Sequence, residues 1–122
     1  MLTPTIKQGI YGKVILYSGN CMPGANSCKS SYVSRKIYIR ESVAEKAMEI
    51  TYLKEKTKLV KQVRSNFSGN YQVELPPGTY SVFVEDGGRE YCNLFNGQGV
   101  ACQVTVLSGI VEYNIKIDHA GW

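Results

Sequence analysis

Apolar and polar residues alternate along much of the chain, with the two-residue period of a β-strand that buries one face. Turn-forming residues such as Gly, Pro, Asn and Ser separate the alternating stretches, and this spacing is typical of an antiparallel sandwich. The segments expected to form strands are 9–17, 35–41, 58–65, 71–75, 79–85, 101–107 and 110–117. The pattern therefore predicts an all-β fold, a seven-stranded antiparallel Greek-key sandwich, in a single domain over 9–122 after a tail at 1–8.

Parity within a strand assigns each side chain to the core or to solvent. In the second predicted strand, Ile39 is expected to face the core and Arg40 to face solvent. In the fifth, Tyr80 is expected to point inward and Phe83 outward. Between strands, Gly69 is available for a positive φ, and Pro77 followed by Gly78 suits a type II turn.

The segment 42–52 fits two structures. Ser42 with Glu45 three residues later forms a capping box, and the apolar residues that follow recur at helical spacing. Ile50 and its neighbours favour an irregular strand instead. The sequence leaves open a short helix near 42–50 or an irregular strand.

Composition and charge restrict the protein class. The chain has 122 residues, 43% of them hydrophobic and 20% charged, which is ordinary globular composition and excludes disorder. No apolar run approaches the ~20 residues that a membrane helix needs. The net charge of +4 permits binding to a polyanion but does not require it.

Four cysteines bear on the cellular compartment. Each of two turn-rich loops carries a pair, Cys21 with Cys28 and Cys92 with Cys102, which favours two local disulfides over free thiols. Sequence alone allows three connectivities. Residues 1–8 contain no apolar signal-peptide core, so the chain is either cytosolic or follows a removed export signal. Because of the cysteines we prefer the second, an extracytoplasmic location in the periplasm or at the cell surface.

Three motifs carry a family resemblance. Residues 12–14, GKV, match a G-x-V strand start, residues 65–71, SNFSGNY, a T-D-x-x-G-x-F/Y turn, and residues 75–82, LPPGTYSV, an L-P-P-G-x-Y-x-V hairpin. The chain thus resembles the carboxypeptidase regulatory-like domain, a transthyretin-like (prealbumin) sandwich, but departs from it at 18–34, at 42–58 and in its cysteines. The whole chain also resembles small exported surface lipoproteins of Bacteroidetes, which implies a lipid anchor upstream.

The candidate chemistry argues against an enzyme. The one histidine, His119, follows Asp118 directly, and adjacent strand residues point to opposite faces, so Asp118 does not orient it. Hydroxyisourate hydrolases and intradiol dioxygenases of related folds need several histidines. Glu85 and Asp86 beside two glycines could bind calcium, but a solvated turn is preferred because no EF-hand spacing is present. We expect no catalytic residues, no cofactor and no metal.

A basic stretch holds much of the positive charge, at Lys54, Lys56, Lys58, Lys61 and Arg64. It suits either an anionic glycan or lipid headgroup or an edge strand protected from aggregation, and we prefer the edge strand. Because no aromatic residues interleave with these cations, nucleic acid is not an expected partner.

Two long cysteine-tied loops offer the predicted binding surface. If they meet at one end of the sandwich, they form a composite surface of Asn20, Met22, Tyr91, Asn93, Phe95 and Asn96. The alternative is that Tyr91 and Phe95 cap the core. The expected function is a non-enzymatic exported domain, an envelope-tethered accessory or protein-interaction module. A carbohydrate or small-ligand binding module that uses loop and outward aromatics is the alternative.

Overall fold

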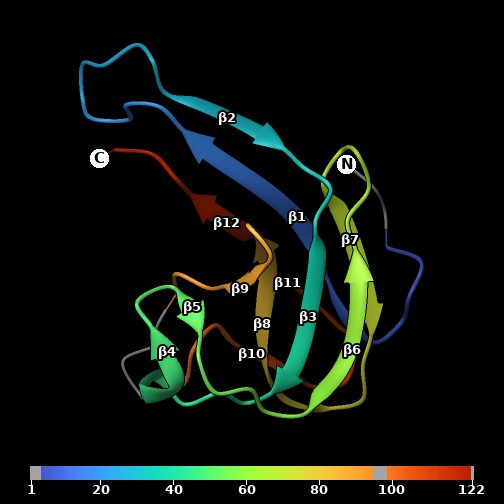
Figure 1. The fold of residues 1–122 in the computed structure, drawn as a ribbon. Helices are drawn as coiled ribbons and strands as arrows, with labels where there is room; N and C mark the ends of the chain where they lie inside the picture. The colour runs from blue at the N-terminus through green and yellow to red at the C-terminus, as the bar shows by residue number, and fades with distance from the viewer. Residues whose placement is uncertain (1–3, 95–98, 122) are drawn as a thin grey trace.

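Two β-sheets pack against each other in the computed structural model, which describes residues 4–94 and 99–121 (Figure 1). The described residues form twelve strands and one 3-10 turn, η1. These elements are β1 Gly9–Ser18, β2 Lys29–Tyr32, β3 Lys36–Glu41, η1 Glu45–Ala47, β4 Met48–Glu49, β5 Tyr52–Leu53, β6 Leu59–Arg64, β7 Asn70–Glu74, β8 Gly78–Asp86, β9 Arg89–Tyr91, β10 Gln103–Val106, β11 Ile110–Glu112 and β12 Ile115–Asp118. The all-β sandwich expected from the alternation is therefore confirmed.

The first sheet is organised around the long strand β1. The N-terminal half of β1 pairs with β7 on one side and β11 on the other, and its C-terminal half pairs with β2 and β12. The β7 and β2 pairings are antiparallel, whereas those with β11 and β12 are parallel. Most strand pairs of the sandwich are therefore antiparallel. The pairs of β1 with β11 and β12 are parallel, because the chain passes through β10 in the other sheet before it returns alongside β1.

The second sheet has the order β4-β5-β9-β8-β3-β6, and β10 also pairs with β8. Ile39 of β3 lies opposite Val82 of β8. Strand β6, which carries part of the basic stretch, ends this order. Strand β6 therefore lies at an edge of the sheet, where charged side chains hinder edge-to-edge pairing with another chain.

The core between the sheets follows the predicted parity. Ile37, Ile39, Tyr80, Val82 and Val84 are all buried, as expected from their inward positions. The core continues into the first sheet through Ile10, Val14, Tyr71, Val73, Leu75, Ile115 and Ile117. The period-two pattern therefore identified the inner faces of both sheets.

A second apolar cluster covers the outer face of the seven-stranded sheet. It consists of Val43, Ala47, Leu53, Phe83, Cys92, Ala101 and Cys102. Phe83 points outward from β8, as its parity predicts, but it is 0% exposed. The expectation that Phe83 faces solvent is therefore wrong, because the chain after β3 crosses back over this face.

The crossing segment, residues 42–53, is irregular rather than helical. η1 is a single 3-10 turn whose N-cap, Ala44, makes no side-chain cap hydrogen bond. Ser42 Oγ instead donates to the Thr79 carbonyl oxygen at 3.2 Å. The predicted capping box does not form, and the short strands β4 and β5, joined through Ile50 at a φ of 56°, are closer to the irregular-strand alternative.

The two predicted turns have different outcomes. Gly69 has a φ of +80°, and a Cβ there would lie 2.8 Å from the Val14 carbonyl oxygen, so glycine is required. Gly78 is not among the glycines with positive φ, so the predicted type II turn is wrong. The Tyr80 hydroxyl donates to the Pro76 carbonyl oxygen at 2.6 Å and closes this turn instead.

Candidate functional site

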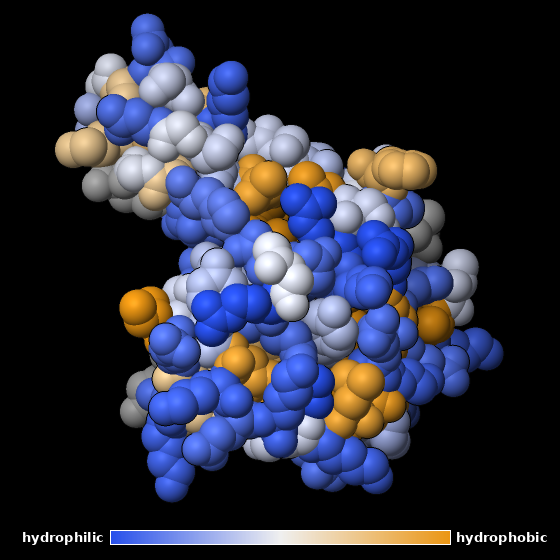
Figure 2. All heavy atoms as spheres, in the orientation of Figure 1, coloured by the Kyte–Doolittle hydropathy of each residue, from blue (hydrophilic) through white to orange (hydrophobic). Residues whose placement is uncertain are grey.

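An arm projects from the sandwich. It consists of the second half of β1, all of β2, the loop between them and the end of β12, at the upper left of Figures 1 and 2. A disulfide between Cys21 and Cys28 closes its tip, and a second joins Cys92 to Cys102. Both predicted disulfide pairs are therefore confirmed.

The C-terminal residues hold the arm in place. The Cys21 backbone N–H donates to the Gly121 carbonyl oxygen at 2.7 Å, and the Gly121 N–H donates to the Gly19 carbonyl oxygen at 2.9 Å. Lys116 Nζ lies 4.6 Å from the centre of the Tyr17 ring. These contacts extend the β1–β12 pairing to the tip, so the arm continues the first sheet.

Strand β2 forms an open edge of the arm. All four of its residues are exposed, and in the described part of the chain it pairs only with β1. The Val33 N–H donates to the Val14 carbonyl oxygen at 3.1 Å, so the backbone groups of Val33 face β1. Successive residues of an antiparallel strand turn their backbone groups alternately toward and away from the partner strand. The backbone groups of Ser30 and Tyr32 therefore point away from β1 and are available to another strand.

A polar cluster joins the base of the arm to the second sheet. Asp86 Oδ2, at the end of β8, lies 2.8 Å from His119 Nε2 and accepts a hydrogen bond from the Tyr52 hydroxyl at 3.0 Å. The Tyr52 and Tyr91 rings meet edge to face, with centroids 5.7 Å apart. Burial, and then the hydrogen bond to Asp86, raise the pKa of Tyr52. Figure 1 shows the β8–β9 turn beside β12.

Sequence reasoning missed the Asp86–His119 pair. It tested only the adjacent Asp118 as a partner, whereas Asp86 lies 33 positions away and on the other sheet. No local pattern signals a contact of this kind. The pair ties the end of β8 to the residue that follows β12.

The described residues contain no group of three His, Cys, Asp or Glu side chains that could hold a metal ion. At the turn considered for calcium, Glu85 Oε2 accepts a hydrogen bond from the Gly88 N–H at 3.1 Å. Asp86 is engaged by Tyr52 and His119. The two carboxylates thus serve separate hydrogen bonds.

A pocket of about 320 Å³ opens on the outer face of the second sheet, and we call it the outer-face pocket. Its polar lining is Tyr38, Arg40, Lys56, Gln62, Arg89 and Glu90. Arg40 was expected to face solvent. It does point outward from β3, but it is 7% exposed because the chain around Thr57 and β9 lies beside it.

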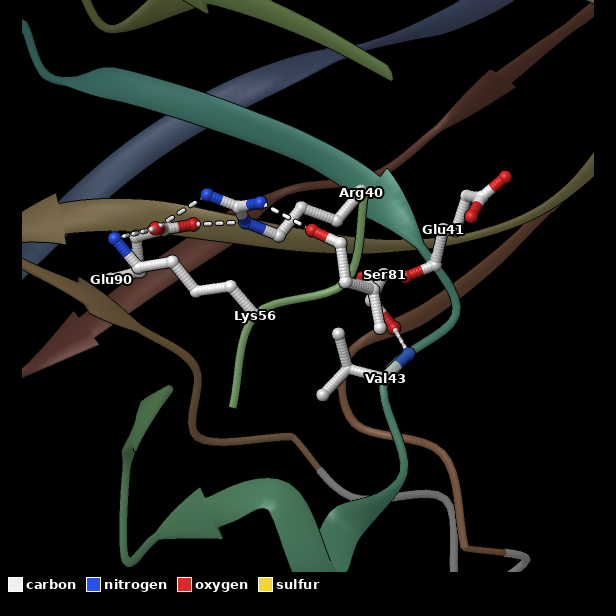
Figure 3. A network of polar contacts seen from close by, with 7 residues as sticks. Arg40, Glu41, Val43, Lys56, Ser81 and Glu90 are labelled. Carbon is white, nitrogen blue, oxygen red and sulfur yellow. Dashed lines mark hydrogen bonds and ion pairs between the residues drawn. The ribbon is translucent and has the colours of Figure 1, made fainter. Parts of the chain in front are cut away.

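The floor of the outer-face pocket is a buried ion pair (Figure 3). Arg40 Nε and Nη2 donate to the two Glu90 carboxylate oxygens at 2.7 and 2.8 Å, and Arg40 Nη1 donates to the Thr57 carbonyl oxygen at 2.6 Å. Lys56 Nζ lies 3.5 Å from Glu90 Oε2. Burial, and then the charge of Glu90, raise the pKa of Tyr38.

Four of the residues predicted to form a binding surface are described, and they do not form one exposed surface. Asn20 and Met22 are exposed on the arm, whereas at the described ends of the other loop the Cys92 N–H donates to the Thr51 carbonyl oxygen and the Gly99 carbonyl oxygen accepts from the Glu45 N–H. Tyr91 is only 4% exposed, so its side chain is not part of the molecular surface. Its hydroxyl accepts a hydrogen bond from the Asp118 N–H. Asn93 is half-buried.

Phe95 and Asn96 lie outside the described residues. The part of the predicted surface that rests on them stays a prediction, while the β1–β2 hairpin carries Asn20 and Met22 beyond the sandwich (Figure 1).

Comparison with family models, with curated proteins and with solved structures found no match to this chain. The described residues include no helix long and apolar enough to cross a membrane. The resemblance to the carboxypeptidase regulatory-like domain therefore stays a prediction from its three motifs.

Proposed function

We propose that this protein is a non-catalytic, exported interaction module that binds a partner protein along the β2 edge of its arm. The observation that carries the proposal is the open edge itself, where Ser30 and Tyr32 offer backbone donors and acceptors to another strand. An exposed edge of this kind binds an extended segment by strand addition, in which main-chain hydrogen bonds supply the affinity.

The charge of the arm favours an acidic partner segment. From residue 13 to residue 32, a stretch that includes the loop and β2, the chain carries two lysines and no aspartate or glutamate. Lys13 Nζ lies 4.1 Å from the centre of the exposed Tyr32 ring at one end of β2, and Lys29 lies at the other. An acidic strand would therefore find complementary charge at both ends of the edge.

The two disulfides support an oxidising compartment, such as the periplasm or the cell surface, because thiols are kept reduced in most cytosols. A lipid anchor upstream of Met1, and a place at the bacterial envelope, remain part of the proposal on the strength of the resemblance alone.

The matched variants for a test are Ser30→Pro and Ser30→Ala. Proline removes the outward N–H of Ser30 while the ladder with β1 is retained, since proline is tolerated where the N–H faces solvent. Alanine keeps that N–H. A library of displayed extended peptides is selected on the wild-type chain, and the selected peptides are measured against both variants.

Enriched acidic peptides that bind wild type and Ser30→Ala, but bind Ser30→Pro at least tenfold more weakly, support the proposal. Peptides that bind all three chains equally would overturn it, as would a selection that enriches none. A self-associating dimer abolished by Ser30→Pro would show that the edge pairs with a second copy, and would also reject the partner proposed here.

A further inference from the structure

The outer-face pocket is separate from the arm and carries an independent inference. It lies on the seven-stranded sheet between β3, β6 and β9. We infer that it binds a single acidic sugar unit, a hydroxylated ring that carries one carboxylate.

Its charge fits a singly charged anion. Arg40, Lys56 and Arg89 contribute three positive charges to the lining and Glu90 one negative charge. Glu49 Oε2 lies 3.7 Å from Arg89 Nη2 and offsets part of the remaining positive charge. A monoanion such as a carboxylate therefore matches the site better than a doubly charged phosphate.

Arg40 is held in place to receive such a group. A guanidinium carries five N–H donors, and the contacts with Glu90 and Thr57 account for three of them. Because Glu90 and the Thr57 carbonyl orient the guanidinium, the remaining donors need little ordering on binding. The exposed Lys56 ammonium can move toward the ligand without a change in the fold.

The other lining groups fit the ring and hydroxyls of a sugar. Tyr38 offers an aromatic surface, and the Gln62 amide and Glu90 carboxylate offer hydrogen bonds to hydroxyl groups. A volume of about 320 Å³ is at the low end for small-molecule sites, which run from about 300 to 1,000 Å³. One sugar ring rather than an extended chain therefore fits inside.

The test uses amide chemical shifts of the whole chain titrated with D-glucuronate. Glucose supplies the ring without the carboxylate, acetate the carboxylate without the ring, and inorganic phosphate a different anion. Lys56→Gln removes one pocket cation, and Lys54→Gln, two residues away and outside the lining, is the matched control for net charge.

We expect glucuronate to shift the amides of Tyr38, Arg89 and Glu90, and Lys56→Gln to weaken binding about tenfold, the change for one charge-assisted contact. Lys54→Gln should bind as wild type does. The inference is overturned if glucose, acetate or phosphate binds as well as glucuronate, if those amides do not move, or if both lysine variants lose affinity equally.

Discussion

Phe83 provides the sharpest test of the two-cluster core. Its side chain is fully buried on the outer face of β8, against Val43 and Leu53 of the crossing segment. Parity alone suggested that Phe83→Ala would cost clearly less stability than Tyr80→Ala. The structure predicts comparable losses, because Phe83 is 0% exposed and Tyr80 is only 7% exposed.

The magnitude follows from the buried area. A phenylalanine buries about 150–250 Å², which at ~25 cal/mol per Å² corresponds to roughly 4–6 kcal/mol before the alanine methyl group is subtracted. Observed Phe→Ala losses in cores are about 3–5 kcal/mol. We therefore expect Phe83→Ala to lower the free energy of unfolding by about 4 kcal/mol.

Urea unfolding followed by circular dichroism, with both disulfides intact, measures this loss. Phe67→Ala is the matched control, because Phe67 is 95% exposed and its removal should change stability by no more than about 0.5 kcal/mol. A loss below about 1 kcal/mol for Phe83→Ala would refute the covered outer face.

Three further predictions concern the ion pair, the disulfides and alkaline pH. Glu90→Gln should lower the free energy of unfolding in urea melts by about 3–5 kcal/mol, because it leaves Arg40 charged and buried. The double variant Arg40→Met with Glu90→Leu should recover most of that loss, and no recovery would contradict the cost of the unpaired charge. Replacing the cysteines of the Cys92–Cys102 bridge with serine should cost about 2–3 kcal/mol, whereas the same change at the Cys21–Cys28 bridge should chiefly speed hydrogen exchange in the arm. Burial raises the pKa of Tyr113 to about 12 and that of Tyr71 well above its usual value, so above pH 10 the unfolded chain loses these protons first and stability should fall as the pH rises from 10 to 12. Tyr113→Phe should remove one tyrosine's share of the fall, and an unchanged slope would argue against it.

The inner faces of the sandwich could be predicted from the sequence because strand parity is a local property. Ile39 and Val82 occupy alternate positions in their strands, so the period of two assigned them to the core without knowledge of their neighbours. The two disulfides were predictable for a related reason, since each links cysteines within one short loop.

The candidate sites depended on contacts between distant parts of the chain. Asp86 and His119 are 33 residues apart, and Arg40 and Glu90 are 50 residues apart. No periodic pattern encodes such a pairing, so the polar cluster at the base of the arm and the floor of the outer-face pocket could not be predicted. The length of the arm likewise depended on how far β12 follows β1.

By itself the sequence determined which face of each strand a side chain occupies and where the turns lie, and it favoured the two local cysteine pairs. Only the tertiary structure decided whether an outward side chain is exposed. Phe83 and Arg40 point outward as their parity requires, yet both are buried. The physical reason is that orientation is set by the pleat of one strand, whereas burial is set by what packs over it, here the crossing segment and β9.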